Sequence, residues 1–387
     1  DAGTYFEAAL AGRILELPQR VYNQALPSSI LVDMRHEFLL GNKSIISQTL
    51  QEELSACLER KEQAILLINR RGYASHVFCR ACGNVLRCKH CSVSLVFHSS
   101  GSSPEKIKEE GLARNGRLNC HHCGFQQSAV QNCPACQSPF LKQFGLGTQK
   151  VEEETLALFP EARILRLDSD ISSRKGAYEE IFNKFANGDA DILIGTQIVA
   201  KGLDIHRVTV VGVLAADAAF NLPDFRSLER GFQLLTQVSG RAGRGEFPGK
   251  VILQTYNTEL PALLMAKNQD YASFVESELA ARRDFDYPPF SRLLRILASG
   301  PDEEQVQSAL ERLAEELSNY LEEFDAIKIL GPAPCLIERI KGQFRFHIII
   351  KNLMGDSGQE AIASFFRSKP HFPGVRLTID VDPMDLV

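Results

Sequence analysis

The middle of the chain alternates short apolar runs with amphipathic stretches. Apolar runs of strand length recur at 64–69, 163–168, 190–195, 209–217 and 250–255. Stretches with helical periodicity lie at 44–60, 148–159, 173–188 and about 225–239. Short continuous apolar runs are typical of strands buried on both faces, and their alternation with helices is typical of parallel sheets. The pattern therefore predicts an α/β fold with a doubly wound parallel sheet.

The rhythm changes from about residue 287 onward. The expected order is a strand at 291–299, a helix at 302–323, strands at 326–331 and 343–352, a helix at 359–368 and a strand at 375–382. This β-α-β-β-α-β order predicts an α+β, ferredoxin-like domain. Asp302 and Gln305 fit a capping box at the start of the first of these helices.

We divide the chain on this basis into four parts. The expected divisions are a lead-in segment at 1–42, a sheet domain at 43–74 and 146–285, an insertion at 75–145, and a C-terminal domain at 286–387. The first residues do not read as the start of a domain, so we expect the chain to be a piece of a longer protein. No apolar run reaches 18 residues, which argues against a membrane span.

The ten cysteines change this picture most, because eight of them form four C-x-x-C pairs. The pairs are Cys79/Cys82, Cys88/Cys91, Cys120/Cys123 and Cys133/Cys136. Pairs inside a large chain without a signal peptide indicate metal ligation in a reducing cytoplasm rather than disulfides. Cys57 and Cys335 lie in helix-like and strand-like runs and read as buried structural thiols.

Four such pairs predict two zinc sites of four thiolates each. Spacing alone allows three ways to combine the pairs. A nested combination, outer pair with outer pair and inner with inner, fits an insertion whose ends return to neighbouring points of a sheet. Histidines could also replace a cysteine ligand, and the candidates are His90, His98, His121 and His122.

The insertion also differs from the rest of the chain in charge. Residues 74–147 hold eight Lys and Arg against three Glu, a net +5, whereas the whole chain carries −5. A basic module on an acidic body predicts contact with nucleic acid. Aromatic side chains there either stack on bases or pack around the metal sites, and they are Tyr73, Phe78, Phe97 and Phe125. The low-complexity stretch Ser99–Gly111 is expected to be a mobile loop.

Two loops of the sheet domain carry candidate phosphate chemistry. The first is GTQIVAKGLDI (195–205), where Thr196 offers a hydroxyl and Asp204 a carboxylate. The second is QVSGRAGR (237–244), where Arg241 and Arg244 offer planar donors that match phosphate oxygens, unless they merely satisfy a helix C-terminus. The 387 residues hold no G-x-x-x-x-G-K-[ST] loop. The arginines therefore suit a phosphate that this chain does not itself cradle.

These motifs together resemble a known family. The two loops look like motifs V and VI of superfamily 2 helicases. With NRRGYA (69–74), the four C-x-x-C pairs, GLGTQKVEE (145–153) and RLDSD (166–170), the chain resembles the replication-restart helicases of the primosomal protein N′ (PriA) family. The resemblance implies a RecA-like second helicase lobe with a zinc insertion and a C-terminal domain, following a first lobe with the Walker motifs.

The resemblance also implies residue roles. It assigns Arg241, Arg244 and Gln237 to catalysis at the ATP phosphates, and Gly202 and Asp204 to the nucleotide. It assigns Thr196 and Lys201 to DNA, while Arg70 and Arg71 are either DNA contacts or exposed cations at a strand end. It implies the nested pairing: Cys79, Cys82, Cys133 and Cys136 on one zinc, and Cys88, Cys91, Cys120 and Cys123 on the other.

The expected activity is an ATP- and Mg²⁺-dependent 3′-to-5′ DNA helicase that acts at stalled forks, with this chain inactive alone. The implied partners are forked and single-stranded DNA, single-stranded-DNA-binding protein and other primosome and helicase-loading proteins, with no membrane. The expected location is cytoplasmic, bacterial or organellar, near the nucleoid. A non-catalytic, zinc-dependent primosome scaffold is the alternative from another class. Another superfamily 2 translocase would fit the two loops but not the cysteines.

Overall fold

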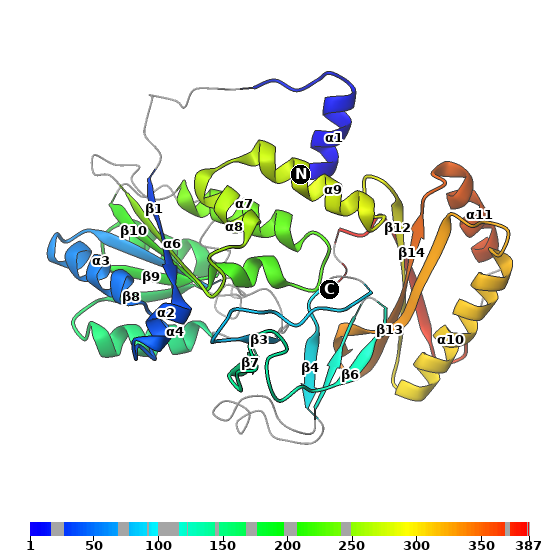
Figure 1. Ribbon diagram of the computed structural model, residues 1–387, viewed down its shortest axis with the longest axis horizontal. Helices are drawn as coiled ribbons and strands as arrows, with labels where there is room; N and C mark the ends of the chain where they lie inside the picture. The colour runs from blue at the N-terminus through cyan, green and yellow to red at the C-terminus, as the bar shows by residue number, and fades with distance from the viewer. Residues whose placement is uncertain are drawn as a thin grey trace.

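The computed structural model places a parallel sheet and an antiparallel sheet at opposite ends of the molecule, with small cysteine-rich strands between them (Figure 1). It describes residues 1–16, 27–68, 77–90, 93–99, 116–121, 123–143, 147–167, 176–196, 207–240, 249–367, 372–384 and 386. Within these ranges, no helix is both long enough and apolar enough to cross a membrane.

The parallel sheet has six strands in the order β1-β11-β10-β2-β9-β8. They are β1 (Ser28–Asp33), β11 (Lys250–Thr255), β10 (Val208–Leu214), β2 (Gln63–Ile68), β9 (Ile192–Gly195) and β8 (Ile164–Leu167). All neighbouring pairs are parallel. Every residue of β2, β9 and β10 is buried, as continuous apolar runs require in a covered sheet. The predicted doubly wound sheet is confirmed.

Helices cover both faces of this sheet, as separate cores on its two sides show. One core joins the strands to α3 (Gln48–Glu59) and α4 (Thr148–Leu158). The other joins them to α6 (Ala177–Ala186), α7 (Ser227–Ser239), α8 (Pro261–Asn268) and α9 (Tyr271–Asp284). Ser47 caps α3 by accepting from the Leu50 N–H, and Gly188 follows α6 with a φ of +84°, which favours glycine.

The first forty residues contribute structure that the sequence pattern did not predict. They form α1 (Ala2–Leu10), β1 and α2 (Met34–Leu39). Strand β1 pairs in parallel with β11 along its whole length, from Ser28 opposite Lys250 to Asp33 opposite Thr255. Strand β1 is thus an edge strand of the parallel sheet.

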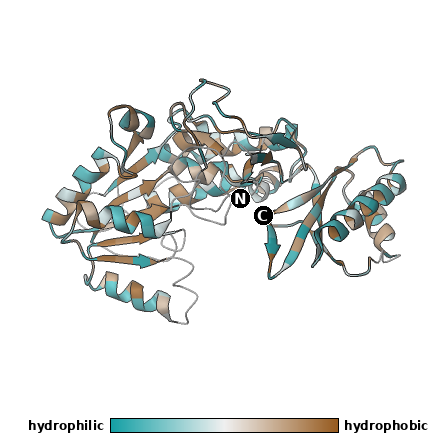
Figure 2. Cartoon of the chain, turned by 90° about the horizontal axis from the view of Figure 1, so that it is seen from below, coloured by the Kyte–Doolittle hydropathy of each residue, from teal (hydrophilic) through white to brown (hydrophobic). Residues whose placement is uncertain are grey.

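The antiparallel sheet has the strand order β13-β14-β12-β15. Its strands are β12 (Arg292–Gly300), β13 (Ile327–Ile340), β14 (Gln343–Asn352) and β15 (Arg376–Val381), and α10 (Glu303–Tyr320) and α11 (Asp356–Arg367) share one core with it. Its strands and the inner sides of its helices are largely apolar, while the outer sides of the helices are polar (Figure 2). The predicted β-α-β-β-α-β order is confirmed.

At the start of α10, Asp302 accepts from the Gln305 N–H at 2.9 Å, which confirms half of the predicted capping box. The Gln305 side chain donates instead to the Pro373 carbonyl at 2.8 Å.

The cysteine-rich segment lies between β2 and α4. Strands β3 (Val77–Cys79) and β7 (Leu141–Gln143) pair antiparallel at its base. A second small sheet contains β4 (Val96–Ser99), β5 (Gly116–Asn119) and β6 (Gln126–Ser128). The segment has its own apolar core, in which buried cysteines pack with Val77, Leu95, Leu118 and Leu141. The stretch predicted to be a mobile loop lies almost entirely outside the described residues.

Candidate functional site

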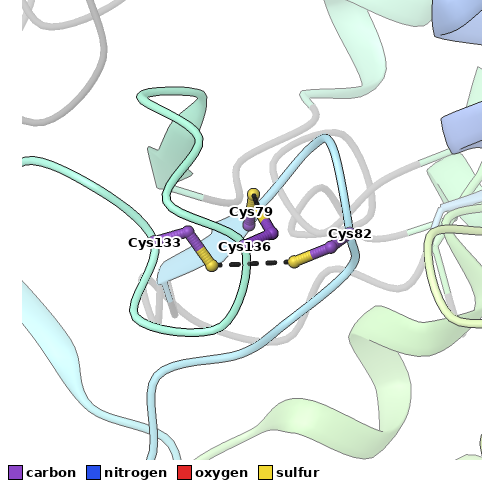
Figure 3. A group of neighbouring side chains, drawn as sticks. All are labelled: Cys79, Cys82, Cys133 and Cys136. Atoms are coloured by element: carbon purple, nitrogen blue, oxygen red, sulfur yellow. Dashed lines mark hydrogen bonds between the residues drawn. The ribbon is translucent and has the colours of Figure 1, made fainter.

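Four cysteines from the two ends of the insertion meet in one cluster. Cys79 and Cys82 come from the segment that begins with β3, and Cys133 and Cys136 from the segment that leads to β7. Their sulfurs point toward one another (Figure 3) and all lie within 4.8 Å. The sulfurs of Cys79 and Cys136 are 3.7 Å apart, and those of Cys82 and Cys133 are 3.6 Å apart.

These separations suit a tetrahedral zinc ion. With Zn–S bonds of about 2.3 Å, the edge of a ZnS₄ tetrahedron is about 3.8 Å. Burial raises the pKa of Cys79 and of Cys82, whereas at Cys133 burial is outweighed by hydrogen bonds from backbone N–H groups and neighbouring thiols, which lower the pKa. A metal ion that binds thiolates must therefore displace protons from this cluster. The donor set and its spacing fit the zinc that the resemblance implies, and the outer pairs share one cluster as in the nested arrangement.

The backbone around the cysteines explains why the sulfurs converge. In three of the four C-x-x-C turns, the first cysteine accepts from an N–H four residues later: Gly83 to Cys79, Gly124 to Cys120, and Gln137 to Cys133, at 2.8 to 3.0 Å. These three donor residues all have positive φ values between 60° and 75°. In these three pairs, the turn places both thiols on the same side.

The inner cluster contains Cys88, Cys120 and Cys123. The sulfurs of Cys88 and Cys123 are 3.7 Å apart, and the His90 N–H lies 3.5 Å from the Cys88 sulfur. The fourth predicted ligand, Cys91, lies outside the described residues. Two cysteine clusters that could hold zinc ions are thus present. None of the described histidines takes part in either of them.

The outer cluster is fixed against the parallel sheet. A Cβ at Gly83 would lie 1.9 Å from the carbonyl oxygen of Tyr256, which follows β11, so only glycine fits there. Arg35 donates to the Cys82 carbonyl at 3.3 Å and is itself paired with Asp33 at 2.7 Å. Asp33 ends the unpredicted strand β1 and Arg35 lies in α2, and no local sequence signal marked them as supports of the metal cluster.

The other end of the insertion contacts the antiparallel sheet. His121 Nδ1 lies 2.8 Å from the Pro334 carbonyl of β13, and His347 Nε2 of β14 lies 2.6 Å from the His121 carbonyl. Arg295 of β12 donates to His347 Nδ1 at 3.1 Å. The insertion therefore bridges the two sheets.

The structure limits which aromatic side chains could stack on bases. Phe78 and Phe97 are only 6% and 4% exposed, and Phe78 packs on the Tyr256 ring at 4.9 Å between centroids. Packing is thus the better interpretation of these two residues. Phe125 is half-buried, with Lys89 over its ring at 4.9 Å. Tyr73 lies outside the described residues.

Only part of the predicted nucleotide and DNA site can be located. Thr196 directly follows β9, is 6% exposed, and donates its N–H to the Leu167 carbonyl at 3.4 Å. Gln237 is exposed on the last turn of α7. The other predicted residues lie outside the described part of the chain, and they are Arg70, Arg71, Lys201, Gly202, Asp204, Arg241 and Arg244.

Comparison with known proteins identifies two segments. Residues 143–246 match the helicase conserved C-terminal domain, and residues 283–384 match the primosomal protein N C-terminal domain. Among solved structures, Dbp5 of S. cerevisiae bound to RNA and ADP BeF3 is similar over 73% of this chain and 52% of its own, at 10% identity and a TM-score of 0.31. That score is too low to support a structural argument.

Two curated relatives match most of the chain. Replication restart protein PriA of Bacillus subtilis is 44% identical over 340 residues, which are 87% of this chain and 40% of the relative. The PriA of Synechocystis is 42% identical over 373 residues, 96% of this chain and 43% of the relative.

The parallel sheet and its matching segment define a protein that carries a helicase C-terminal domain. More specifically, the chain belongs to the replication restart protein PriA family, and it spans less than half the length of these two relatives.

Proposed function

We propose that the chain is the C-terminal part of an ATP-dependent 3′-to-5′ DNA helicase that recognises stalled or abandoned replication forks and promotes primosome assembly. The observation that carries this proposal is the combination within one chain. A helicase sheet, a cysteine-rich insertion between β2 and α4, and a ferredoxin-like domain contact one another through Gly83 at one end and His121 at the other. The PriA relatives support replication restart as the process.

In this proposal the sheet domain contributes one side of a nucleotide site. Arg241, Arg244 and Gln237 face the phosphates of ATP, and Gly202 and Asp204 approach the nucleotide, while ATP and Mg²⁺ are held by a lobe of a longer protein. Thr196 and Lys201, with Arg70 and Arg71, contact DNA. The 387 residues hold no Walker A motif, so this chain alone should not hydrolyse ATP.

The insertion holds two zinc ions in the nested arrangement. The outer ion is bound by Cys79, Cys82, Cys133 and Cys136, whose geometry supports it. The inner ion is bound by Cys88, Cys91, Cys120 and Cys123. These ions are structural, since four thiolates leave no open position. With the ferredoxin-like domain, the insertion binds forked and single-stranded DNA, single-stranded-DNA-binding protein and helicase-loading partners in a bacterial or organellar cytoplasm.

One experiment separates this helicase from a non-catalytic scaffold. In a protein that adds a nucleotide-binding lobe to this chain, Arg244→Ala should lower DNA-stimulated ATP hydrolysis by about three orders of magnitude or more, because an arginine at the transferred phosphoryl group contributes roughly 10³–10⁵. Arg241→Ala should act in the same direction. Arg244→Lys should restore little, since it keeps the charge but loses the planar donors.

Fork binding should persist in these variants. Wild-type turnover in a folded Arg244→Ala protein would reject the catalytic role and favour the scaffold. ATP hydrolysis that copurifies with the 387-residue chain would reject the proposal that this chain is inactive alone.

A further inference from the structure

Three side chains outside the cysteine clusters meet where the insertion contacts the ferredoxin-like domain. They are His98 of β4, His121 just after β5, and Glu338 of β13. The Nε2 atoms of His98 and His121 lie 3.1 Å apart. The Glu338 carboxylate lies 3.3 Å from His98 Nδ1. The cluster therefore joins two elements of the insertion to a strand of another sheet.

The partners of the two rings determine where their protons lie. The Pro334 carbonyl can only accept, so His121 must carry its proton on Nδ1 to make the 2.8 Å bond. The Glu338 carboxylate, 3.3 Å from His98 Nδ1, favours a proton on that nitrogen. A neutral imidazole carries a single N–H. The two Nε2 atoms face each other at 3.1 Å, so the point between them is occupied either by a proton, if one ring is doubly protonated, or by a metal cation bound to both nitrogens.

The geometry suits a transition-metal cation. With Zn–N bonds of about 2.0–2.1 Å, two imidazole nitrogens on a tetrahedral ion lie about 3.3–3.4 Å apart. Histidines that bind metal usually donate their second ring N–H to a carboxylate or a backbone carbonyl, and this cluster has one of each. Imidazole donors favour zinc and its neighbours over Mg²⁺ or Ca²⁺.

The exposure of the cluster allows an ion to enter. His121 is 2% exposed, whereas the side chains of His98 and Glu338 are 28% and 43% exposed. An ion on the two Nε2 atoms would be reached from the His98 side, and water could complete its coordination. Glu338 supplies negative charge next to it.

The geometry points to a third metal site, in which Nε2 of His98 and Nε2 of His121 bind a divalent transition-metal ion such as Zn²⁺ and Glu338 orients His98. The ion ties β4 to the segment after β5. Because the His121 ring and backbone bond Pro334 and His347, it also stiffens the contact between the insertion and the ferredoxin-like domain. This site is separate from the cysteine clusters, and it would make the contact sensitive to metal supply.

The test uses the full 387-residue chain after gel filtration. The metal that remains bound at this stage is called the tightly held metal. Zn²⁺ is titrated against a chromophoric chelator, and one further equivalent is expected beyond the tightly held metal. With Co²⁺ as the probe, this additional ion should show ligand-field bands without the thiolate charge-transfer absorption of the cysteine clusters.

His98→Ala should lose the additional equivalent and keep the tightly held metal. His36→Ala removes a histidine from α2, away from the cluster, and should keep both. Glu338→Gln should weaken uptake without abolishing it. Should His98→Ala fold poorly, His98→Gln replaces it, and it should lack the Zn²⁺-dependent rise in Tm that is expected of the wild type.

Two results would overturn the site. The first is a wild-type chain that takes up no ion beyond its tightly held metal, with ¹⁵N shifts showing a doubly protonated His98 between its two partners. The second is a folded His98 variant that titrates like the wild type.

Discussion

The sulfur of Cys82 lies 3.6 Å from the sulfur of Cys133, although the two residues are 51 positions apart. Cys79 and Cys136 approach in the same way, at 3.7 Å. Antiparallel pairing of β3 with β7, with Cys79 opposite Leu141, brings the two ends of the insertion together. Of the three ways in which spacing allows the C-x-x-C pairs to combine, the strand pairing selects the one that joins Cys79/Cys82 with Cys133/Cys136.

Replacing Cys133 by serine should remove one metal ion. The variant leaves three thiolates at the outer cluster and does not change the inner one, so metal analysis should fall from about two equivalents of zinc to about one. Mass spectrometry of the native protein can count the ions directly.

Cys57→Ser is the matched control for this change. Cys57 is a buried thiol next to Thr209, with its pKa raised by burial to about 11, and it lies in neither cluster. Its variant should keep both ions. A wild-type protein with eight titratable thiols and no zinc would contradict the metal assignment.

A buried ion triad should stabilise the packing of α9 against α7. Arg282 of α9 lies 2.7 Å from Glu229 of α7 and 2.7 Å from Glu278, and all three side chains are at most 5% exposed. Arg282→Ala leaves two buried carboxylates without their cation and should lower the free energy of unfolding by about 3–5 kcal/mol. Urea denaturation measures this change.

The neighbouring Arg283→Ala tests whether the effect comes from burial. Arg283 is exposed, and its guanidinium lies 4.8 Å from the centre of the Phe290 ring. Its loss should cost no more than about 1 kcal/mol. An equal loss of unfolding free energy in the two variants would show that burial of the triad adds no stability.

Asp217 should make stability depend on pH. Burial raises its pKa from 3.8 to about 6. Its Oδ2 accepts from the Tyr256 N–H at 3.0 Å, while Oδ1 has no partner among the described residues. The folded state therefore holds a proton between about pH 4 and pH 6 that the unfolded state has released, so this group favours folding more as the pH falls.

Comparison with Asp217→Asn isolates this contribution. Above pH 6 the wild type bears a buried charge that the variant lacks. The wild type should gain about 2 kcal/mol relative to the variant as the pH falls from 8 to 4. Denaturation curves at several pH values measure the difference, and parallel curves for the two proteins would contradict the raised pKa.

The exposed cations of the insertion should contribute to DNA affinity through phosphates. Lys89 lies over the Phe125 ring and Arg117 is exposed on β5. Replacing either by alanine should weaken binding equally for all sequences, and it should reduce the slope of log affinity against log salt by about 0.7–0.9. Fluorescence anisotropy at several salt concentrations gives the slope.

Lys184→Ala is the control for the DNA measurement. Lys184 is exposed on α6 and pairs with Glu180 at 2.7 Å. It should leave the slope unchanged. An unchanged slope for the Lys89 and Arg117 variants as well would place the DNA contacts elsewhere.

The sequence predicted the parts of the fold whose apolar runs are long and continuous. Strands β2, β9 and β10 are buried along their whole length, and such strands leave a clear signal. Strand β1 was missed because it is an edge strand that starts with two serines and has a single buried residue, Val32. An edge position removes the requirement for apolar residues on both faces, and the signal disappears with it.

The cysteine ligands could be predicted from the sequence, but the histidine cluster could not. The two cysteines of a C-x-x-C pair lie three positions apart, so the sequence alone marks them as metal ligands. The eight thiols could therefore be proposed without a structure. The meeting of His98 with His121 and Glu338 could not, because it depends on how the insertion rests on β13. Contacts between residues far apart in the chain leave no trace in local spacing.

The closed base of the insertion has a consequence for how such proteins can vary. Because β3 pairs with β7 beside a four-sulfur cluster, the two ends of the insertion are held together. Doubling the length of a loop beyond such a closure costs only about 0.6 kcal/mol. Insertions and deletions between β4 and β5 can therefore accumulate while the register of the sheet stays unchanged.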